Sequence, residues 1–373
     1  MKTKIKTFKQ ARLVLEDGSE YSGFCFGKAR SQAGEVVFST GMGGYTQTLT
    51  DPGLRGQILV STYPLIGNCG VPFKKEMLCD KHGIPLHFES ENIQASGFVI
   101  SDLCEDPSHY ASDCTLSEWL DNGNIPGIFG IDTRALTMRL RESGVMRGKI
   151  LVEGSRDVTL DSGVLAHPVE EVSSQEVKTY KPAESGKQVR IALVDCGVKA
   201  SVLRSLLARN AEVIRVPWNH DLSGIEYDGL FISNGPGDPK KCGKTIAMIR
   251  KAFAVGKPIF GICIGSQIMA LAAGADTYKL PYGHRGQNQP CVEAGTSRCY
   301  ITSQNHGYAV RGDTLPRGWE AWFTNANDGT VEGIRSLKHP FSAVQFHPDG
   351  CPGPKDTDFL VDRFLDQARE AKK

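Results

Sequence analysis

From residue 189 onward the sequence alternates short apolar runs with amphipathic stretches, and this alternation limits the possible folds more than any other feature. Apolar runs of strand length are found at Val189–Val194, Glu212–Val216, Gly229–Ile232 and Pro258–Ile262. Helical patterns lie between and after them, at Ala200–Arg209, Ile246–Val255 and Ser266–Ala273. Nearly continuous apolar strands that alternate with helices form a parallel sheet covered on both faces. We therefore predict an α/β fold with an open, mostly parallel sheet, and we expect the active site at the carboxyl ends of its strands.

The chain is long enough for two domains, since 373 residues exceed the roughly 100–200 residues of one ordinary domain. A polar stretch without apolar periodicity, Thr179–Gln188, contains a proline and a glycine and is the predicted linker. We therefore predict an N-terminal domain at 1–180 and a C-terminal domain at 188–373. The first half indicates a smaller mixed α/β domain, with strand-like runs and helical stretches at Arg12–Leu15, Gln57–Thr62, Thr115–Gly123 and Thr133–Ser143.

The balance of charge and the hydropathy exclude several classes of function. The 43 basic and 42 acidic residues nearly cancel, so nothing indicates binding to nucleic acid or to a membrane surface. No apolar run approaches the roughly 20 residues that span a bilayer. The Lys-rich segment Met1–Gln10 lacks the apolar stretch of a secretory signal. We interpret that segment as a short solvated tail, with the remnant of a transit peptide as the alternative.

The eleven cysteines show no C-x-x-C spacing, which argues against a zinc site or a redox motif. Most of them are expected to be small buried thiols of a protein in a reducing compartment, which we predict to be the cytoplasm. No metal and no organic cofactor is predicted for this chain. A single cysteine in an unusual setting is therefore more informative than their number.

Cys263 has such a setting, because it lies between the predicted strand Pro258–Ile262 and the following helix. Gly261 and Gly265 complete a G-x-C-x-G pattern, the thiol counterpart of the G-x-S-x-G nucleophile elbow. A tight turn there would present the side chain to the cleft, and the helix N-terminus would favour the thiolate. The backbone N–H of Ile264 would point toward an oxyanion. The alternative interpretation is a buried structural cysteine in a turn that contains glycine.

A thiol nucleophile needs a group that accepts its proton, and His347 is the best-placed histidine. It follows the apolar run Ala343–Phe346 and therefore also lies at the end of a predicted strand. Asp349, two residues further on, could hold the imidazole by a hydrogen bond. His306 is the main competitor for the role of base. An isolated histidine is more often a surface or structural residue, but His347 shares its strand-end position with Cys263.

The segment Ser233–Pro239 follows the predicted strand Gly229–Ile232 and contains a proline with one glycine on each side. Such a rigid turn exposes backbone N–H groups at the edge of the sheet and can bind an anion or a carbonyl oxygen. A plain turn is the alternative, because Gly, Pro, Asn and Asp dominate turns. A phosphate-binding loop is excluded, since no G-x-x-x-x-G-K-[ST] pattern occurs.

Together these three segments resemble the class I glutamine amidotransferases, in which an oxyanion loop, a nucleophile elbow and a histidine segment occur in the same order. The matching sequences are Asn-Gly-Pro-Gly-Asp-Pro at 234–239, Gly-Ile-Cys-Ile-Gly-Ser-Gln at 261–267 and Phe-His-Pro-Asp at 346–349. The first half resembles the N-terminal domain of the glutaminase subunit of carbamoyl-phosphate synthetase, in the segments 34–38, 40–51 and 62–70. Further segments, at 285–290, 302–307 and 324–329, resemble the eukaryotic form of the pyrimidine pathway, in which the glutaminase is often fused to the synthetase.

The resemblance implies a reaction and roles for individual residues. Cys263 would attack the side-chain carbonyl of L-glutamine and form a glutamyl thioester. His347 would be the proton shuttle, and Asp349 stands in the place of the family's Glu. The backbone N–H groups of Gly235 and Ile264 would bind the oxyanion. The ends of the glutamine would be held by the residues at matching positions, namely Gly237, Gln267, Asn305, Gly307 and Tyr308.

The resemblance also implies a partner, because the released ammonia has to be consumed. It would pass to a carbamoyl-phosphate synthetase, either a separate large subunit or a fused synthetase domain. ATP, bicarbonate and Mg²⁺ are expected only on that partner, since no sequence for their sites is found in this chain.

Three departures from the family pattern weaken the implied site. Asp349 is one methylene shorter than Glu, Ser266 replaces a His after the elbow, and Gly53 replaces a Ser that contacts glutamine in the family. The loss of one hydrogen bond to a charged group would cost about 1.5–3 kcal/mol. A degenerate, non-hydrolysing module of an ammonia-dependent synthetase is therefore the alternative function. A γ-glutamyl hydrolase or a peptidase on the same sheet is the third possibility.

Overall fold

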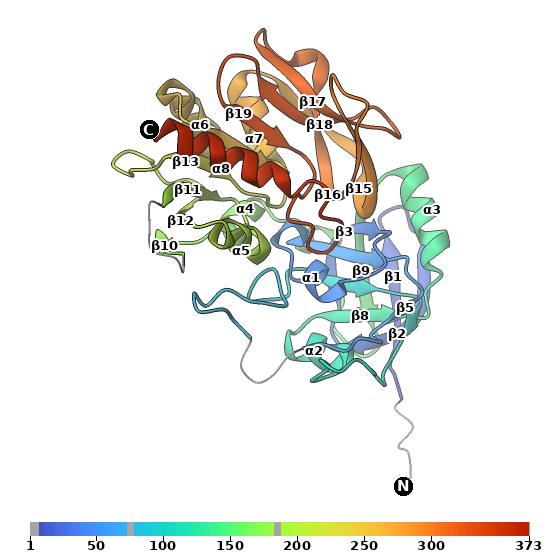
Figure 1. Cartoon of the computed structure of the whole chain (residues 1–373). Coiled ribbons are helices and arrows are strands. Elements are labelled where there is room, and N and C mark those ends of the chain that lie inside the picture. The colour runs from blue at the N-terminus through green and yellow to red at the C-terminus, as the bar shows by residue number, and fades with distance from the viewer. Residues whose placement is uncertain (1–6, 73–77, 183–187, 373) are drawn as a thin grey trace. The chain divides into compact units, whose positions relative to one another are not determined.

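The structure is a computed structural model that describes residues 7–72, 78–182 and 188–372, and it divides into two compact units (Figure 1). Unit 1 comprises residues 1–78 and 90–166, and unit 2 comprises residues 79–89 and 167–373. The boundary lies before His167 and not after residue 180 as predicted, because strand β10 (Lys178–Tyr180) pairs with strand β12 of the sheet in unit 2. Residues 183–187 of the predicted linker lie outside the described residues.

Unit 1 is built on a closed barrel of strands in the order β1-β2-β8-β6-β4-β3-β9. The antiparallel pairing of β1 with β9 closes the barrel, whereas β3, β4, β6 and β8 run parallel to one another. The runs predicted at Arg12–Leu15 and Gln57–Thr62 are confirmed as β1 and β4. The strands are β1 (Gln10–Leu15), β2 (Glu20–Gly27), β3 (Gln32–Ser39), β4 (Gln57–Ser61), β6 (Gly97–Val99), β8 (Pro126–Phe129) and β9 (Met146–Val152).

The longer helices of unit 1, α2 (Leu116–Asn122) and α3 (Thr133–Ser143), lie where the amphipathic pattern predicts them. A capping box begins α2: the hydroxyl of Thr115 accepts from the N–H of Glu118, and the carboxylate of Glu118 accepts from the N–H of Thr115. The remaining elements are short, namely α1 (Tyr45–Leu49), η1 (Pro52–Leu54), β5 (Leu65–Ile66), β7 (Asp102–Leu103) and η2 (Leu160–Gly163).

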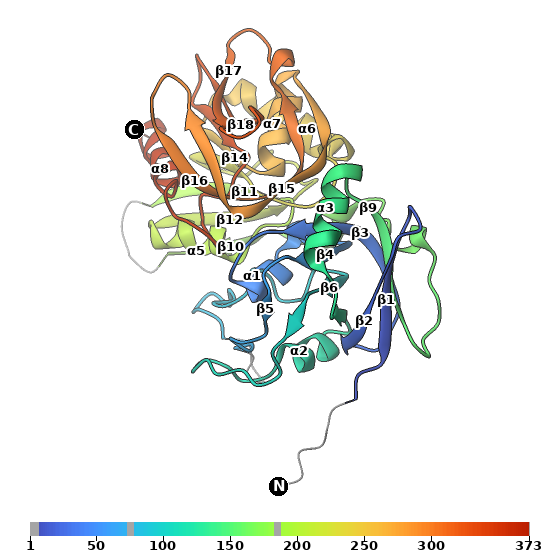
Figure 2. The same cartoon turned by 90° about the vertical axis from the view of Figure 1, so that its right-hand side faces the viewer.

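Unit 2 is built on a ten-stranded sheet in the order β10-β12-β11-β13-β14-β19-β18-β16-β15-β17. The strands from β12 to β19 in this order pair in parallel, which confirms the predicted parallel sheet. The other strands pair antiparallel, and the long strands β15 and β16 (Figure 2) form a hairpin among them. The strands are β11 (Val189–Asp195), β12 (Ala211–Pro217), β13 (Gly229–Ile232), β14 (Ile259–Ile262), β15 (Asp276–Glu293), β16 (Cys299–Arg311), β17 (Trp319–Asn325), β18 (Val331–Ser336) and β19 (Phe341–Val344).

Helices cover both faces of the parallel strands, as predicted. Side chains of α5 (Ala200–Ala208) and α8 (Phe359–Ala371) share one apolar core with Ile191 and Leu193 of β11. Side chains of α6 (Gly243–Val255) and α7 (Ile264–Ala273) share a second core with Ala192 and Val194 of the same strand. The two cores lie on opposite faces of the sheet, because successive residues of a strand point to opposite sides. The short helices η3 (Pro239–Lys241), η4 (Gly312–Thr314) and α4 (Pro168–Val172) complete unit 2.

The register of the parallel strands brings separate chain segments together at one edge of the sheet. Ile232 at the end of β13 pairs with Val194 of β11 and with Gly261 of β14. Ile262 of β14 pairs with Val344 of β19. The segments that follow these strands are 196–199, 233–239, 263–267 and 345–349. Because they begin side by side, this edge is where a functional site is expected.

Within the described ranges, each helix is too short or too polar to span a lipid bilayer.

Loss of the capping box is expected to loosen α2. In Thr115→Ala the N–H of Glu118 loses its acceptor, which costs about 1 kcal/mol of helix stability. Amide hydrogen exchange in α2 should therefore become about fivefold faster, as measured by mass spectrometry. Thr159→Ala is the matched control, because Thr159 precedes η2 without capping it through its side chain. Unchanged exchange in α2 of the Thr115 variant would contradict the capping role.

Candidate active site

Cys263 forms the tight turn between β14 and α7, and its backbone conformation is unusual. Its φ of 55° and ψ of −112° lie in a region that residues with a Cβ rarely adopt. The glycines on either side make the turn possible. A Cβ on Gly265 would lie 2.4 Å from the carbonyl oxygen of Ile232, and one on Gly261 would lie 2.8 Å from the carbonyl carbon of Gly265. The predicted G-x-C-x-G turn is therefore present, and neither glycine leaves room for a larger residue.

The thiol of Cys263 is buried at the start of a helix. The residue is 4% exposed, and its Sγ lies 3.7 Å from the backbone oxygen of Asn305. The next residue, Ile264, is the first of α7, so its N–H has no acceptor inside the helix. This N–H and the helix dipole both favour negative charge near the sulfur. The arrangement suits a nucleophilic thiolate.

His347 lies shortly after β19, close enough to Cys263 for the thiol to raise the pKa of its ring. Neither ring nitrogen of His347 has a hydrogen-bond partner among the described residues. Its backbone N–H donates to the carbonyl oxygen of Ser303 at 2.9 Å, which ties this segment to β16. The side chain is buried, and its Nδ1 lies 3.6 Å from Oδ1 of Asp349. That distance is longer than a hydrogen bond, so the predicted bond between His347 and Asp349 takes the form of a close ion pair.

Opposing effects of the surroundings set the charge of His347. Burial and the cation of Lys199 lower the pKa of His347, whereas Asp349 and Cys263 raise it, and the outcome is a raised pKa of about 9. His347 is therefore an imidazolium at neutral pH. An imidazolium is the form of His347 that can later give a proton to a leaving group.

Asp349 is held by a cation that the sequence analysis missed. Nζ of Lys199 donates to Oδ2 of Asp349 at 2.6 Å, and the hydroxyl of Ser201 lies 2.8 Å from the same oxygen. The charged side chains of Lys199 and Asp349 are both buried. Burial raises the pKa of Asp349, but Lys199 and His347 outweigh it and hold this pKa well below its usual range. The signal in the sequence was the position of Lys199 just after the strand β11.

The same network continues to Glu89, from the segment of residues 79–89 that belongs to unit 2. The hydroxyl of Ser201 lies 2.6 Å from Glu89, and with a single proton it can donate to Glu89 or to Asp349 but not to both. The backbone N–H of Ser201 also donates to Glu89 at 3.0 Å, and Arg204 lies 3.7 Å from its carboxylate. The buried charge of Glu89 is thereby compensated.

The predicted glutamine-binding residues of α7 and β16 contact one another. Nε2 of Gln267 donates to the carbonyl oxygen of Tyr308 at 2.7 Å. Asn305 supplies the backbone oxygen that faces the nucleophile. A Cβ on Gly307 would lie 3.3 Å from Nη2 of Arg285, so the glycine lets the guanidinium approach the chain. The structure therefore places Gln267 beside Tyr308, and Asn305 beside the thiol of Cys263.

The loop 233–239 has the tight form that its Gly-Pro-Gly sequence predicts. A Cβ on Gly235 would lie 2.0 Å from the carbonyl oxygen of Cys196, and Gly237 adopts a left-handed φ of 87°. Because β13 pairs with β14, this loop begins beside the turn of the nucleophile. Gly53, by contrast, belongs to unit 1, where it lies in η1.

His306, the competing candidate for the base, is engaged elsewhere. Its Nδ1 lies 2.8 Å from the carbonyl oxygen of Tyr308, and its Nε2 lies 3.1 Å from Oε1 of Gln304. Burial, followed by the nearby cation of His284, lowers the pKa of His306 well below its usual range. His306 is therefore engaged with Tyr308 and Gln304, and His347 is the histidine whose pKa is raised by Cys263.

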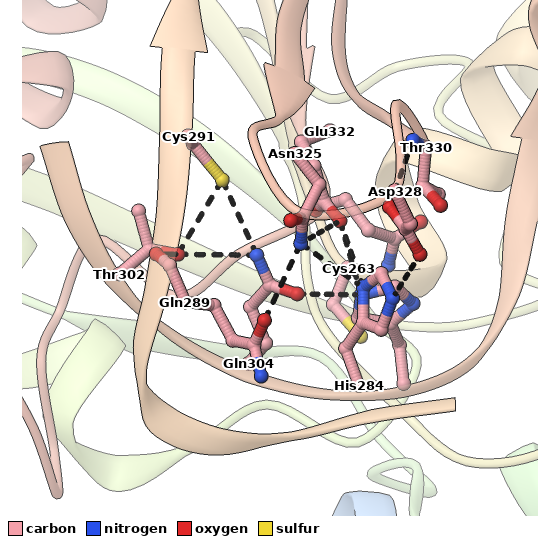
Figure 3. A network of polar contacts seen from close by, with 12 residues as sticks. Cys263, His284, Gln289, Cys291, Thr302, Gln304, Asn325, Asp328, Thr330 and Glu332 are labelled. Carbon is pink, nitrogen blue, oxygen red and sulfur yellow. Dashed lines mark hydrogen bonds and ion pairs between the residues drawn. The ribbon is translucent and has the colours of Figure 1, made fainter. Parts of the chain in front are cut away.

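One cluster within the described residues combines three side chains of the types that bind metals. His284, His306 and Glu332 have ligand atoms that all lie within 4.8 Å of one another. Figure 3 shows His284 and Glu332 of this cluster. Hydrogen-bond donors fill the space between them, because the ring of His284 pairs with Glu332 and Asp328 and the amide of Asn325 donates to Glu332. We interpret the cluster as a network of ion pairs and hydrogen bonds.

Two family models match the chain. Residues 192–367 match the model described as glutamine amidotransferase class-I, which agrees with the parallel sheet and the cysteine turn of unit 2. Unit 2 is therefore a class I glutamine amidotransferase domain. Residues 13–150 match the model described as the CPSase domain of the carbamoyl-phosphate synthase small chain. The chain belongs to this small-chain family, and both matches lie in it one after the other.

Curated relatives resemble the chain over nearly its whole length. It is 49% identical over 366 residues to the multifunctional protein CAD of Squalus acanthias, with 97% of this chain and 16% of the relative covered. It is 46% identical over 375 residues to the multifunctional protein pyr1-3 of Dictyostelium discoideum, with 96% and 17% covered. It is also 46% identical over 365 residues to the mitochondrial carbamoyl-phosphate synthase [ammonia] of Aquarana catesbeiana, with 97% and 24% covered. The chain thus spans less than a quarter of the length of these relatives.

Gly265→Ala is expected to disrupt the turn that presents Cys263, because the added Cβ would meet the backbone of β13. Alkylation of Cys263 by iodoacetamide at neutral pH, followed by mass spectrometry, should slow at least about tenfold as the thiolate loses the helix N-terminus. Gly243→Ala is the matched control, since Gly243 also lies in a first helical turn but a Cβ there meets no atom within 4 Å. Equal alkylation rates in both variants would contradict the role of Gly265.

Proposed function

We propose that unit 2 hydrolyses L-glutamine to glutamate and ammonia, with Cys263 as the nucleophile and His347 as the proton carrier. The observation that carries this proposal is the buried pair of Cys263 and His347 at the carboxyl edge of a class I glutamine amidotransferase sheet. A thiolate beside an imidazolium suits attack on an amide, because the nucleophile and the acid for the leaving group are both in place.

In the proposed reaction the thiolate of Cys263 attacks the side-chain carbonyl carbon of glutamine, and the carbonyl electrons move onto the oxygen. The backbone N–H groups of Gly235 and Ile264 would bind this oxyanion. His347 gives its proton to the amide nitrogen, so that ammonia leaves and a glutamyl thioester remains. Water then gives a proton to His347 and attacks the thioester, which releases glutamate and restores the thiolate and the imidazolium.

The remaining residues of the site would position the substrate and the histidine. Asp349 would orient His347 and stabilise its positive charge, and Lys199 would fix Asp349 through their ion pair at 2.6 Å. Gly53 offers no side chain in place of the family's Ser, so we expect a weaker affinity for glutamine. The amino and carboxylate ends of glutamine would be held by Gly237, Gln267, Asn305, Gly307 and Tyr308.

The ammonia would be consumed by a carbamoyl-phosphate synthetase, as a large subunit or as a fused domain. The match of unit 1 to the small-chain CPSase domain and the names of the relatives support this partner. ATP, bicarbonate and Mg²⁺ would bind to that partner, and the glutaminase reaction itself needs no cofactor, because thiolate and imidazolium supply its chemistry. All eleven cysteines are free thiols, which suits the proposed cytoplasmic location.

A non-hydrolysing module of an ammonia-dependent synthetase is the alternative, and one observation favours it. The carboxylate of Asp349 is 3.6 Å from His347 but 2.6 Å from Lys199, so it supports the histidine less directly than a hydrogen bond would. The relative from Aquarana catesbeiana carries the word ammonia in its name. In this case the thiol of Cys263 would have no catalytic role.

Release of ammonia from glutamine separates the two functions. We expect release by the whole chain and faster release after addition of a synthetase large subunit. Cys263→Ala should reduce release at least about 10³-fold, because the nucleophile is lost. Cys242→Ala is the control, since Cys242 is another buried thiol and lies at the start of α6. A folded wild-type chain that releases no ammonia under either condition would favour the non-hydrolysing module.

The pKa of His347 predicts the pH dependence of the reaction. Because this pKa is raised to about 9, the imidazolium is fully present near neutral pH and is lost as the pH rises through 9. The kcat/KM for glutamine should therefore fall along an alkaline limb near pH 9. Asp349→Asn removes a group that raises this pKa, so the limb should move to lower pH. A limb that stays in place in Asp349→Asn would contradict the pairing of His347 with Asp349.

A further inference from the structure

His284 of β15 is bracketed by two carboxylates (Figure 3). Its Nδ1 lies 3.0 Å from Oε1 of Glu332, at the start of β18, and its Nε2 lies 2.9 Å from Oδ2 of Asp328, in the turn before that strand. The side chain of Glu332 is completely buried, and that of His284 is 9% exposed. A carboxylate accepts hydrogen bonds, so a ring with one on each side donates from both nitrogens and carries a positive charge.

The groups around this triad agree with a cation at His284. Burial lowers the pKa of His284, but Glu332 and Asp328 outweigh it, and the pKa is raised. Burial raises the pKa of Glu332, which His284 and Asn325 lower only in part, so this carboxylate depends on its neighbours. The amide of Asn325 donates to Oε1 of Glu332 at 3.4 Å. Oε2 of Glu332 has no hydrogen-bond partner among the described residues, so its partners are concentrated on one oxygen.

His306 connects this triad to the glutamine site. It pairs with His284 across the hairpin of β15 and β16, and the two rings meet edge to face with centroids 5.0 Å apart. Nδ1 of His306 lies 2.8 Å from the carbonyl oxygen of Tyr308, which also accepts from Gln267. The residue before His306 is Asn305, whose carbonyl oxygen faces the nucleophile. The cation at His284 also lowers the pKa of His306, so the positive charge of this pair of rings stays on His284.

We propose that the imidazolium of His284, clamped between Glu332 and Asp328, is a positioning residue for the glutamine site. It holds His306 in place, and His306 holds the backbone of 305–308 against α7. His284 does not touch the reacting atoms. The proposal deepens the glutaminase function above and rests on it, because the segment 305–308 is where the ends of glutamine would bind.

Titratable groups face His284 from each neighbouring element. Glu332 comes from β18 and Asp328 from the turn before it, while His306 faces the ring from β16. Arg285, next to His284 on β15, acts on His306 in the same direction as His284. The amide nitrogen of Asn325 lies 3.4 Å from Oε1 of Glu332 and 3.5 Å from Nδ1 of His284. A hydrogen-bond donor therefore already faces the two atoms that a metal ion would have to share, and a proton between them suits the space better.

A charge-removal experiment tests the positioning role. In His284→Asn the buried carboxylate of Glu332 loses its cation, and the KM for glutamine should rise about tenfold while kcat changes less than about twofold. The double variant His284→Asn with Glu332→Gln also removes the uncompensated charge. Its KM should therefore return at least halfway, on a logarithmic scale, to the wild-type value. His339→Asn, at an exposed histidine before β19, is the control and should change neither constant. An unchanged KM in His284→Asn, or no recovery in the double variant, would overturn the proposal.

A spectroscopic measurement tests the charge independently of catalysis. In the whole chain labelled with ¹⁵N-histidine, both ring nitrogens of His284 should be protonated at pH 7, with the signal assigned by its loss in His284→Asn. A neutral His284 ring at this pH would overturn the proposal. Treatment with a chelator should leave both the NMR signal and the KM unchanged. If the protein instead contains one equivalent of zinc, and removal of the zinc raises the KM, then a metal and not a proton lies between His284 and Glu332, and the proposal is overturned.

The outcomes separate this proposal from the glutaminase function. If the wild-type chain hydrolyses glutamine and His284→Asn has a normal KM, only the positioning role fails. If the wild-type chain hydrolyses none, glutamine binding is measured by calorimetry in Cys263→Ala with and without His284→Asn. If the double variant binds glutamine about tenfold more weakly than Cys263→Ala, the positioning role is supported independently of the reaction. If the two variants bind glutamine equally, or if Cys263→Ala binds none, the positioning role is overturned.

Discussion

The backbone of Cys263 is the constraint on which the geometry of unit 2 depends. A non-glycine residue held at a φ of 55° costs about 1–3 kcal/mol, which the surrounding packing has to offset. Gly261 and Gly265 allow β14 and α7 to approach the backbone around them at distances that any Cβ would block. The N–H of Cys263 donates to the carbonyl oxygen of Val344 at 2.9 Å, which continues the pairing of β14 with β19. The same pairing brings His347 to the thiol.

Two buried ionic clusters stabilise the segments that meet at this turn. One joins Lys199 to Asp349 and contacts His347, and the other joins His284 to Glu332 and contacts His306. A buried ion pair adds little net stability, but removal of one partner typically costs about 3–5 kcal/mol because the other charge remains uncompensated. These clusters therefore act chiefly by fixing positions. Each of them connects a different chain segment to a histidine near the nucleophile.

The local sequence pattern was sufficient to predict the parallel strands and the functional residues at their ends. It was insufficient to predict interactions between residues that are far apart in the sequence. Cys263 and His347 could be predicted because each directly follows an apolar run. Lys199 also follows a strand, but no local motif connects it to a carboxylate 150 residues later. The predicted boundary after residue 180 was wrong because a polar stretch is a local signal, whereas the pairing of β10 with β12 depends on the whole sheet. The hairpin of β15 and β16 mixes polar and apolar positions, so it has no clear strand period.

The sequence by itself determined the parallel core of unit 2, the turn at Cys263 and the order of the segments around it, because apolar period and glycine spacing act over a few residues. Tertiary structure alone decided which charges meet. Asp349 pairs more closely with Lys199 than with His347, and His284 becomes a bridge between Glu332 and Asp328. Such pairs form between residues that the sheet brings together from distant parts of the chain. Their strength depends on burial, which is a property of the folded protein and not of any short segment.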